Sequence, residues 1–163
     1  MKPILIFEFN LNTDITSWKI VNDVVMGGKS ESNFYLDQRG NGTFEGHVSL
    51  DSNGGFCSVK YIFEPITINK NKFICILLKG DGKKYQFRVK SHRVDPHSYV
   101  YSFQTSTDWQ TIKIPISELH PTFRGRKLDI PNYDGSNLEE IAFLIGNKKE
   151  EIYQLHIARI EVL

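Results

Sequence analysis

Apolar and polar residues alternate along much of the chain. From Lys84 to Lys90 the odd positions are apolar and the even positions are polar. A period of two is typical of a β-strand that buries one face and exposes the other, so Arg88 is expected to point away from the core. The same alternation runs through Ser98–Gln104 and continues in Trp109–Ile114. These three segments are therefore predicted to be strands.

Short apolar runs bounded by turn residues predict the remaining strands. They are Ile4–Phe9, Trp18–Val21, Asn33–Leu36, Thr43–Leu50, Phe56–Phe63, Phe73–Lys79, Ile141–Ile145 and Tyr153–Val162. Glycine-rich turns at 39–42, 53–55, 80–82 and 133–135 separate several of them. Only Pro115–Leu119 and Asn137–Ile141 suit a helical turn. This spacing predicts one all-β domain over residues 1–163, built as a two-sheet β-sandwich or jelly roll.

Composition and charge narrow the range of partners. The chain has 163 residues, and its 20 Lys and Arg against 19 Asp and Glu give a formal charge of +1. No overall field attracts nucleic acid or an anionic membrane, so neither is a predicted partner. The longest apolar runs, Ile4–Phe7 and Ile74–Leu78, are far shorter than the roughly 20 residues that span a bilayer. The first residues lack the pattern of a signal peptide, which favours a cytoplasmic location.

The residues that could carry catalysis or bind metal do not form a known motif. His92 and His97 lie in a polar loop without cysteine or carboxylate partners at zinc-site spacing. Ser30 is outside any nucleophile elbow, and Asp81 is a turn residue. No catalytic residue, metal or cofactor is predicted. Cys57 and Cys75 lie in apolar strand segments and are predicted to be reduced core residues.

Three loops contain more polar residues and glycines than a simple turn needs. The first, 22–30, holds Asp23 with Gly27 and Gly28; the second, 51–56, holds Asn53 with Gly54 and Gly55; the third, 121–126, holds Arg124, Gly125 and Arg126. The glycines allow backbone conformations that shape a loop or let it approach a ligand. The arginines suit either a carboxylate or phosphate ligand or an internal anchor. A structural role and a binding role both remain open for each loop.

Together with Lys79–Arg88, these segments resemble the complex I intermediate-associated protein family. The family pattern is a Trp followed by Asn-Asp-x-Val-Met-Gly-Gly-x-Ser-x-Ser, then Gly-x-Val-Ser-Leu leading into Asn-Gly-Gly-Phe, and later Arg-Gly-Arg. It is matched by Trp18, 22–32, 46–56 and 124–126. The resemblance implies a galactose-binding-domain-like jelly roll, related in architecture to carbohydrate-binding modules. It also implies, for mitochondrial members, a role in assembling respiratory complex I, and this chain is expected to be the compact family domain.

We therefore expect a non-catalytic binding module whose partner is a protein, with respiratory-complex subunits as candidates. The alternative is a carbohydrate-binding module, for which Tyr99, Tyr101, Trp109 and Tyr133 could stack on sugar rings; an enzyme is the remote alternative. The predicted binding site brings together Asp23, Asn53, Arg88, Arg124 and Arg126 on one net-positive face suited to an acidic group. In the alternative, Asp23 pairs with an arginine and locks two loops.

Overall fold

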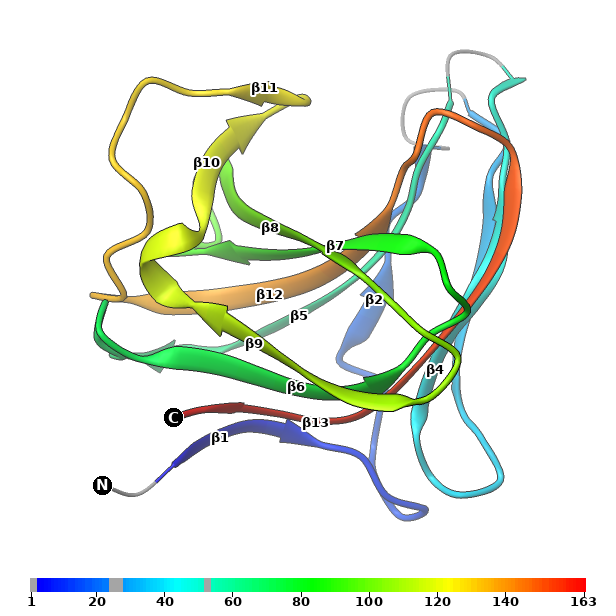
Figure 1. Ribbon diagram of the computed structural model, residues 1–163, viewed down its shortest axis with the longest axis horizontal. Coiled ribbons are helices and arrows are strands. Elements are labelled where there is room, and N and C mark those ends of the chain that lie inside the picture. Colours follow the sequence, from blue (N-terminus) through cyan, green and yellow to red (C-terminus); the bar gives the residue numbers. More distant parts are fainter. Residues whose placement is uncertain (1–2, 24–27, 52–53) are drawn as a thin grey trace.

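The protein folds as two antiparallel β-sheets packed face to face, which confirms the predicted sandwich (Figure 1). The structure, a computed structural model, describes residues 3–23, 28–51 and 54–163. The six-stranded sheet has the order β3 (Glu31–Leu36), β4 (Gly42–Val48), β13 (Glu151–Val162), β6 (Phe73–Lys79) and β9 (Trp109–Pro115), with β1 (Ile4–Glu8) also paired to β13. The seven-stranded sheet has the order β11 (Arg126–Lys127), β10 (His120–Phe123), β8 (Ser98–Gln104), β7 (Lys84–Lys90), β12 (Leu138–Ile145), β5 (Cys57–Ile66) and β2 (Trp18–Ile20).

The structure differs from the sequence predictions at two places. The helical turn suggested for Asn137–Ile141 is wrong, because β12 already begins at Leu138 and pairs on both sides, with β5 and β7. The loop expected at 121–126 instead contains β10 and β11, which form a hairpin on the edge of the sheet. The other helical candidate, Pro115–Leu119, contains a 3₁₀ helix, η3 (Ile116–Glu118).

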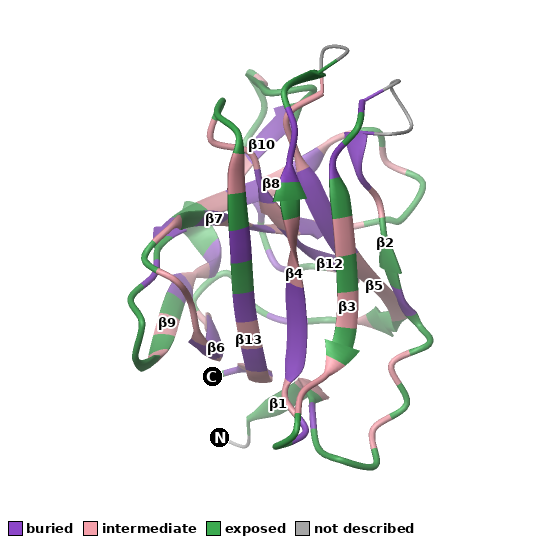
Figure 2. Ribbon diagram, turned by 90° about the vertical axis from the view of Figure 1, so that its right-hand side faces the viewer, coloured by how far each residue is buried: buried purple, intermediate pink, exposed green. Residues whose placement is uncertain are grey.

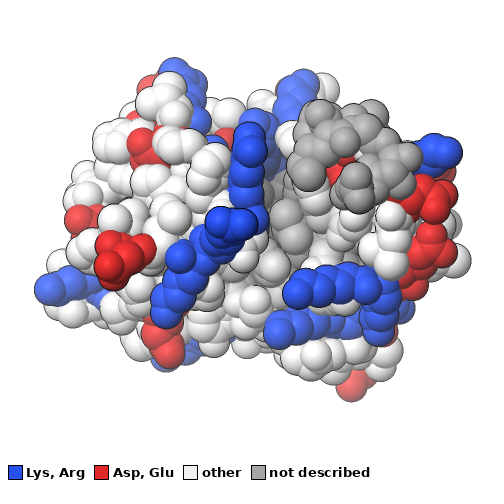
Figure 3. Space-filling model, turned by 90° about the horizontal axis from the view of Figure 1, so that it is seen from above, with Lys and Arg blue, Asp and Glu red and all other residues white. Residues whose placement is uncertain are grey.

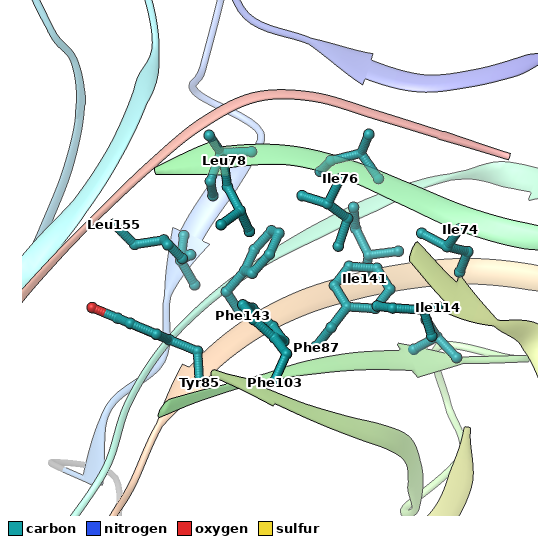
Figure 4. Close-up of a cluster of buried hydrophobic side chains, with 14 of the residues drawn as sticks. Ile74, Ile76, Leu78, Tyr85, Phe87, Phe103, Ile114, Ile141, Phe143 and Leu155 are labelled. Carbon is teal, nitrogen blue, oxygen red and sulfur yellow. The ribbon is translucent and has the colours of Figure 1, made fainter. Parts of the chain in front are cut away.

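The core lies between the inner faces of the two sheets (Figure 4). Ile76, Phe87 and Phe143 are among its fully buried side chains, and burying such a side chain contributes about 1.5–3 kcal/mol. On β13, buried and more exposed residues alternate along the strand, as a period of two requires (Figure 2). Cys57 and Cys75 are free and buried, as predicted, and burial raises the pKa of both thiols.

Because each sheet uses one face for the core, each leaves an outer face to solvent. The outer face of the seven-stranded sheet is at the top of Figure 1, next to the β10–β11 hairpin. In the described part of the chain, no helix has the length and apolar character needed to cross a membrane.

Candidate functional site

Asp23 is fully buried, and its carboxylate connects two loops. The N–H of Ser30 donates to Oδ1 at 3.0 Å, and the N–H groups of Gly55 and Phe56 donate to Oδ2 at 2.6 and 3.3 Å. The Ser30 hydroxyl donates a further hydrogen bond to Oδ2 of Asp23. Burial alone raises the pKa of Asp23, but these hydrogen bonds outweigh it and leave the pKa below its ordinary value. Asp23 is therefore an ionised internal anchor.

Glycines surround this carboxylate because there is no room for a side chain. A Cβ on Gly28 would lie 2.4 Å from Cγ of Asp23, and one on Gly54 would lie 2.5 Å from Oδ2. Gly55 has a φ of 142°, which favours glycine. We call Asp23, Gly28, Ser30, Gly54, Gly55 and Phe56 the Asp23 junction. Gly27 and Asn53, which the sequence analysis grouped with them, lie outside the described residues.

The structure does not bring Asp23 together with the arginines. Asp23 follows β2 at one edge of the seven-stranded sheet, whereas Arg124 and Arg126 lie on the β10–β11 hairpin at the opposite edge. Arg88 lies between them on β7. The predicted convergence does not include Asp23, because its oxygens are already engaged by donors of its own loops. The alternative, a pair between Asp23 and an arginine, is not formed within the described residues: Asp23 connects two loops through Ser30 and the backbone N–H groups of Gly55 and Phe56.

The hairpin presents its charges to solvent. Arg124 and Gly125 connect β10 to β11 and have φ values of 50° and 78°, so both central residues have the positive φ of a type I′ turn. The guanidinium of Arg124 lies 5.2 Å from the centre of the Phe123 ring. Arg124 and Arg126 are both exposed, and neither forms an ion pair within the described chain. The hairpin is thus a basic protrusion beside the outer face.

A row of paired residues that includes three Lys and Arg side chains crosses that outer face. Directly paired residues of antiparallel strands lie on the same side of a sheet, and Arg88 points away from the core because Phe87 and Val89 on either side are buried. The row that contains it runs through Lys19, Lys60, Ala142, Arg88, Val100 and His120. In the neighbouring row Lys90 pairs with Glu140. Lys and Arg side chains cross the middle of this side of the molecule, and acidic ones lie mostly at its margins (Figure 3).

Arg88 is a partly buried charge of this row that forms no ion pair within the described residues. Its Nη1 donates to Oε1 of Gln86 at 2.8 Å, but within the described residues no carboxylate lies at ion-pair distance. Burial lowers the pKa of Arg88, and Glu140 opposes that shift. Glu140 itself is closer to Lys60, with Oε1 3.8 Å from Nζ, and burial raises the pKa of Glu140. A desolvated guanidinium in this state gains from an added anionic group.

A shallow pocket of about 360 Å³ adjoins Arg88 on the same face. It is lined by Lys84, Gln86, Ser102, Gly146, Asn147 and Lys148. Gln86 connects the pocket to Arg88 through the hydrogen bond described above. No sequence pattern indicates this pocket, because its two halves come from β7–β8 and from the turn after β12. We define Lys19, Lys60, Arg88, Lys90 and this pocket as the basic face.

The structure also bears on the two other candidate functions, metal binding and sugar stacking. Among described residues, no group of three or more His, Cys, Asp and Glu side chains could hold a metal ion. Of the aromatic residues considered for sugar stacking, Tyr133 is buried and packs on Tyr99, with ring centres 5.1 Å apart. Tyr101 is partly buried and packs against the core. Trp109 is different, because 41% of it is exposed.

Known structures with a similar fold include carbohydrate-binding modules. The family 11 module of the cellulosomal cellulase Lic26A-Cel5E of Clostridium thermocellum aligns with a TM-score of 0.75 and 17% identity, over 100% of this chain and 95% of that one. The same type of module in complex with a β-1,3-1,4-mixed-linked tetrasaccharide aligns at 0.69 and 18% identity, over 96% and 94%. At these identities the likeness shows the fold alone.

Sequence comparison identifies the family. An uncharacterized protein of Schizosaccharomyces pombe is 30% identical over an alignment 169 positions long, which covers 90% of this chain and 77% of the relative. The model of the family described as complex I intermediate-associated protein 30 (CIA30) matches residues 7–157. This range contains the Asp23 junction, the whole basic face and the hairpin. The chain therefore belongs to the complex I intermediate-associated protein 30 family.

Proposed function

We propose that this protein is a non-catalytic interaction module that binds an acidic segment of a protein partner on the basic face. The observation that supports this most directly is Arg88, a partly buried guanidinium with no carboxylate at ion-pair distance in the described chain. Lys19, Lys60, Arg88 and Lys90 carry four positive charges, against one negative charge from Glu140 on the same rows. An incoming Asp or Glu carboxylate would neutralise part of this excess and could bind Arg88 in a bidentate manner.

The family points to the kind of partner. Its description associates its members with an intermediate of complex I, so we propose that the acidic segment belongs to a subunit of that complex during assembly. The hairpin lies at the edge of the basic face and would contribute Arg124 and Arg126 to the rim of the same interface. The cytoplasmic location expected from the sequence stays a prediction, which subcellular fractionation would check.

The experiment compares two variants that lose the same charge. Arg88→Gln removes the central guanidinium, whereas Lys70→Gln removes an exposed charge from the turn between β5 and β6. Fluorescence anisotropy with a labelled octaglutamate peptide measures binding at low and physiological salt. Because a hydrogen bond to a charged group is worth about 1.5–3 kcal/mol, Arg88→Gln should weaken binding about tenfold or more, and Lys70→Gln should not. Salt should weaken binding to the unmodified chain.

A second experiment, in cells, tests whether the basic face takes part in the assembly of complex I. The two variants would replace the native protein in its own organism, and assembled complex I would be measured on native gels. We expect Arg88→Gln to lower the amount of complex I and Lys70→Gln to leave it unchanged. Equal peptide binding by both variants would reject the basic face as the site, and unchanged complex I in both would reject the assembly role.

A further inference from the structure

The outer face of the six-stranded sheet carries a second row that the proposed function does not use. Consecutive pairings place Tyr35, Thr43, His156, Lys79 and Trp109 side by side across β3, β4, β13, β6 and β9. Tyr35 and Trp109, at its two ends, are both exposed. The row therefore has polar groups in the middle and an accessible aromatic ring at each side.

A pocket of about 400 Å³ opens on this row. The turn between β3 and β4 supplies Asp37, Gln38, Arg39 and Asn41, and the sheet supplies Lys79, Trp109 and His156. This volume falls in the range of small-ligand sites, about 300–1,000 Å³. We call it the Trp109 pocket.

Trp109 differs from the other tryptophan of the chain. Trp18 is 5% exposed and stacks on Phe34 and Tyr61 in the core. Trp109 is 41% exposed and has no ring contact with another aromatic of the described chain. An indole left open on a pocket wall gains from contact with an apolar ligand surface, and its N–H can still donate a hydrogen bond.

The polar groups of the pocket are held in fixed positions. Asp37 accepts hydrogen bonds from the N–H groups of Arg39 and Asn41 at 2.9 and 3.0 Å, and its Oδ2 lies 3.1 Å from Nδ1 of His156. Burial raises the pKa of Asp37, but the hydrogen bonds outweigh it and keep the pKa below its ordinary value. Nε2 of His156 lies 3.2 Å from Oε1 of Gln154. The Asp37 carboxylate is therefore ionised and held in a fixed orientation before any ligand binds.

Charge distinguishes this pocket from the basic face. Its wall combines one carboxylate, Asp37, with the cations of Arg39 and Lys79, so acceptors and donors stand side by side. An anionic ligand would meet the Asp37 carboxylate. A ligand with neighbouring hydroxyl groups could donate to Asp37 and accept from Lys79 or Arg39, while an apolar ring face covers the indole.

We propose that the Trp109 pocket binds a neutral sugar, with one pyranose ring stacked on the indole and its hydroxyl groups bonded to Asp37 and Lys79. This would be a second function on the sheet opposite the basic face, and it does not depend on binding of an acidic partner. One chain could then bind a glycan and a protein at the same time, on opposite sides of the sandwich.

Fluorescence gives a direct test, because the chain has only two tryptophans and Trp18 is buried. Cellotetraose, mannotetraose and galactotetraose would be titrated while tryptophan emission is recorded, and AMP would serve as an anionic aromatic competitor. We expect at least one tetrasaccharide to shift the emission in a saturable manner and to protect Trp109 from acrylamide quenching. Calorimetry would then measure affinity for each variant.

Matched variants identify the pocket. Trp109→Ala and Asp37→Asn should each weaken sugar binding about tenfold or more, as expected for central contacts. Asp108→Asn, an exposed carboxylate beside Trp109 in sequence but outside the pocket wall, should leave binding unchanged. So should Arg88→Gln, which separates failure of the basic face from failure of this site. The proposal is overturned if no tetrasaccharide binds, if Trp109→Ala binds as well as the unmodified chain, or if only AMP binds.

Discussion

The Asp23 junction and the β10–β11 hairpin are both loops in which charged residues neighbour glycines, yet they lie at opposite edges of the seven-stranded sheet and use their charges differently. At the junction the carboxylate is fully buried and its oxygens are occupied by donors from two loops. At the hairpin the guanidiniums of Arg124 and Arg126 are exposed and unpaired within the described chain. The comparison shows that the partners of the side chain, and not the residue types, decide between a structural and a binding role.

The largest effect that tests this comparison is expected at the junction. Asp23→Ala removes the acceptor of the Ser30, Gly55 and Phe56 N–H groups, of which Ser30 is buried and Gly55 and Phe56 are partly buried. Removing one member of a buried charged network costs about 3–5 kcal/mol, and urea unfolding would measure the loss. Asp51→Ala is the control, since Asp51 is exposed and lies in the second of the two connected loops; it should stay within about 0.5 kcal/mol. Equal stabilities of the two variants would show that the carboxylate does not hold the loops.

Acid should weaken the same junction, by less than the deletion does. The pKa of Asp23 is lower in the folded protein than its ordinary value, so its contribution is present above the unfolded pKa, about 3.9. That contribution is lost as the pH falls through the folded pKa, because the unfolded state then binds the proton more readily. Asp23→Asn cannot titrate at this position, so the difference between its stability and that of the unmodified chain should shrink below about pH 4. A difference that is constant from pH 7 to pH 3 would contradict this.

These effects could not be predicted in detail from the sequence, although the strands could. Alternation identified β7, β8 and β9, and it placed Arg88 on the outer side of its strand. It failed at the start of β12, where Glu140 is held between Ile62 and Lys90 of neighbouring strands, because tertiary pairing overrides a local helical preference. The short strands β10 and β11 were not predicted, because Arg-Gly-Arg has the composition of a loop.

The contacts of the candidate sites depend on residues far apart in the chain. Asp23 and Gly55 are 32 positions apart, and the row through Arg88 joins six strands. Sequence patterns indicate which side of a strand a residue occupies, but register and strand order decide its neighbours. The sequence could therefore single out the glycine-containing segments of both the Asp23 junction and the hairpin. It could not show that only Asp23 has its charged group occupied by hydrogen bonds from the chain itself.

The smallest effect on stability is expected at the hairpin. Arg126→Ala should change the free energy of unfolding by no more than about 0.5 kcal/mol, because Arg126 is an exposed surface residue. Arg124→Ala also removes the contact with the Phe123 ring, and an exposed cation–π contact is worth about 0.5–1 kcal/mol, so its loss should be slightly larger. If the hairpin forms the rim of the interface, each variant should weaken octaglutamate binding about twofold, as the loss of a solvent-exposed charge pair would. Arg124→Lys keeps the charge and should retain most of the binding. Destabilisation by 3 kcal/mol or more, which is the size expected for a buried lock, would show that the hairpin arginines are internal anchors and would remove the contrast with Asp23.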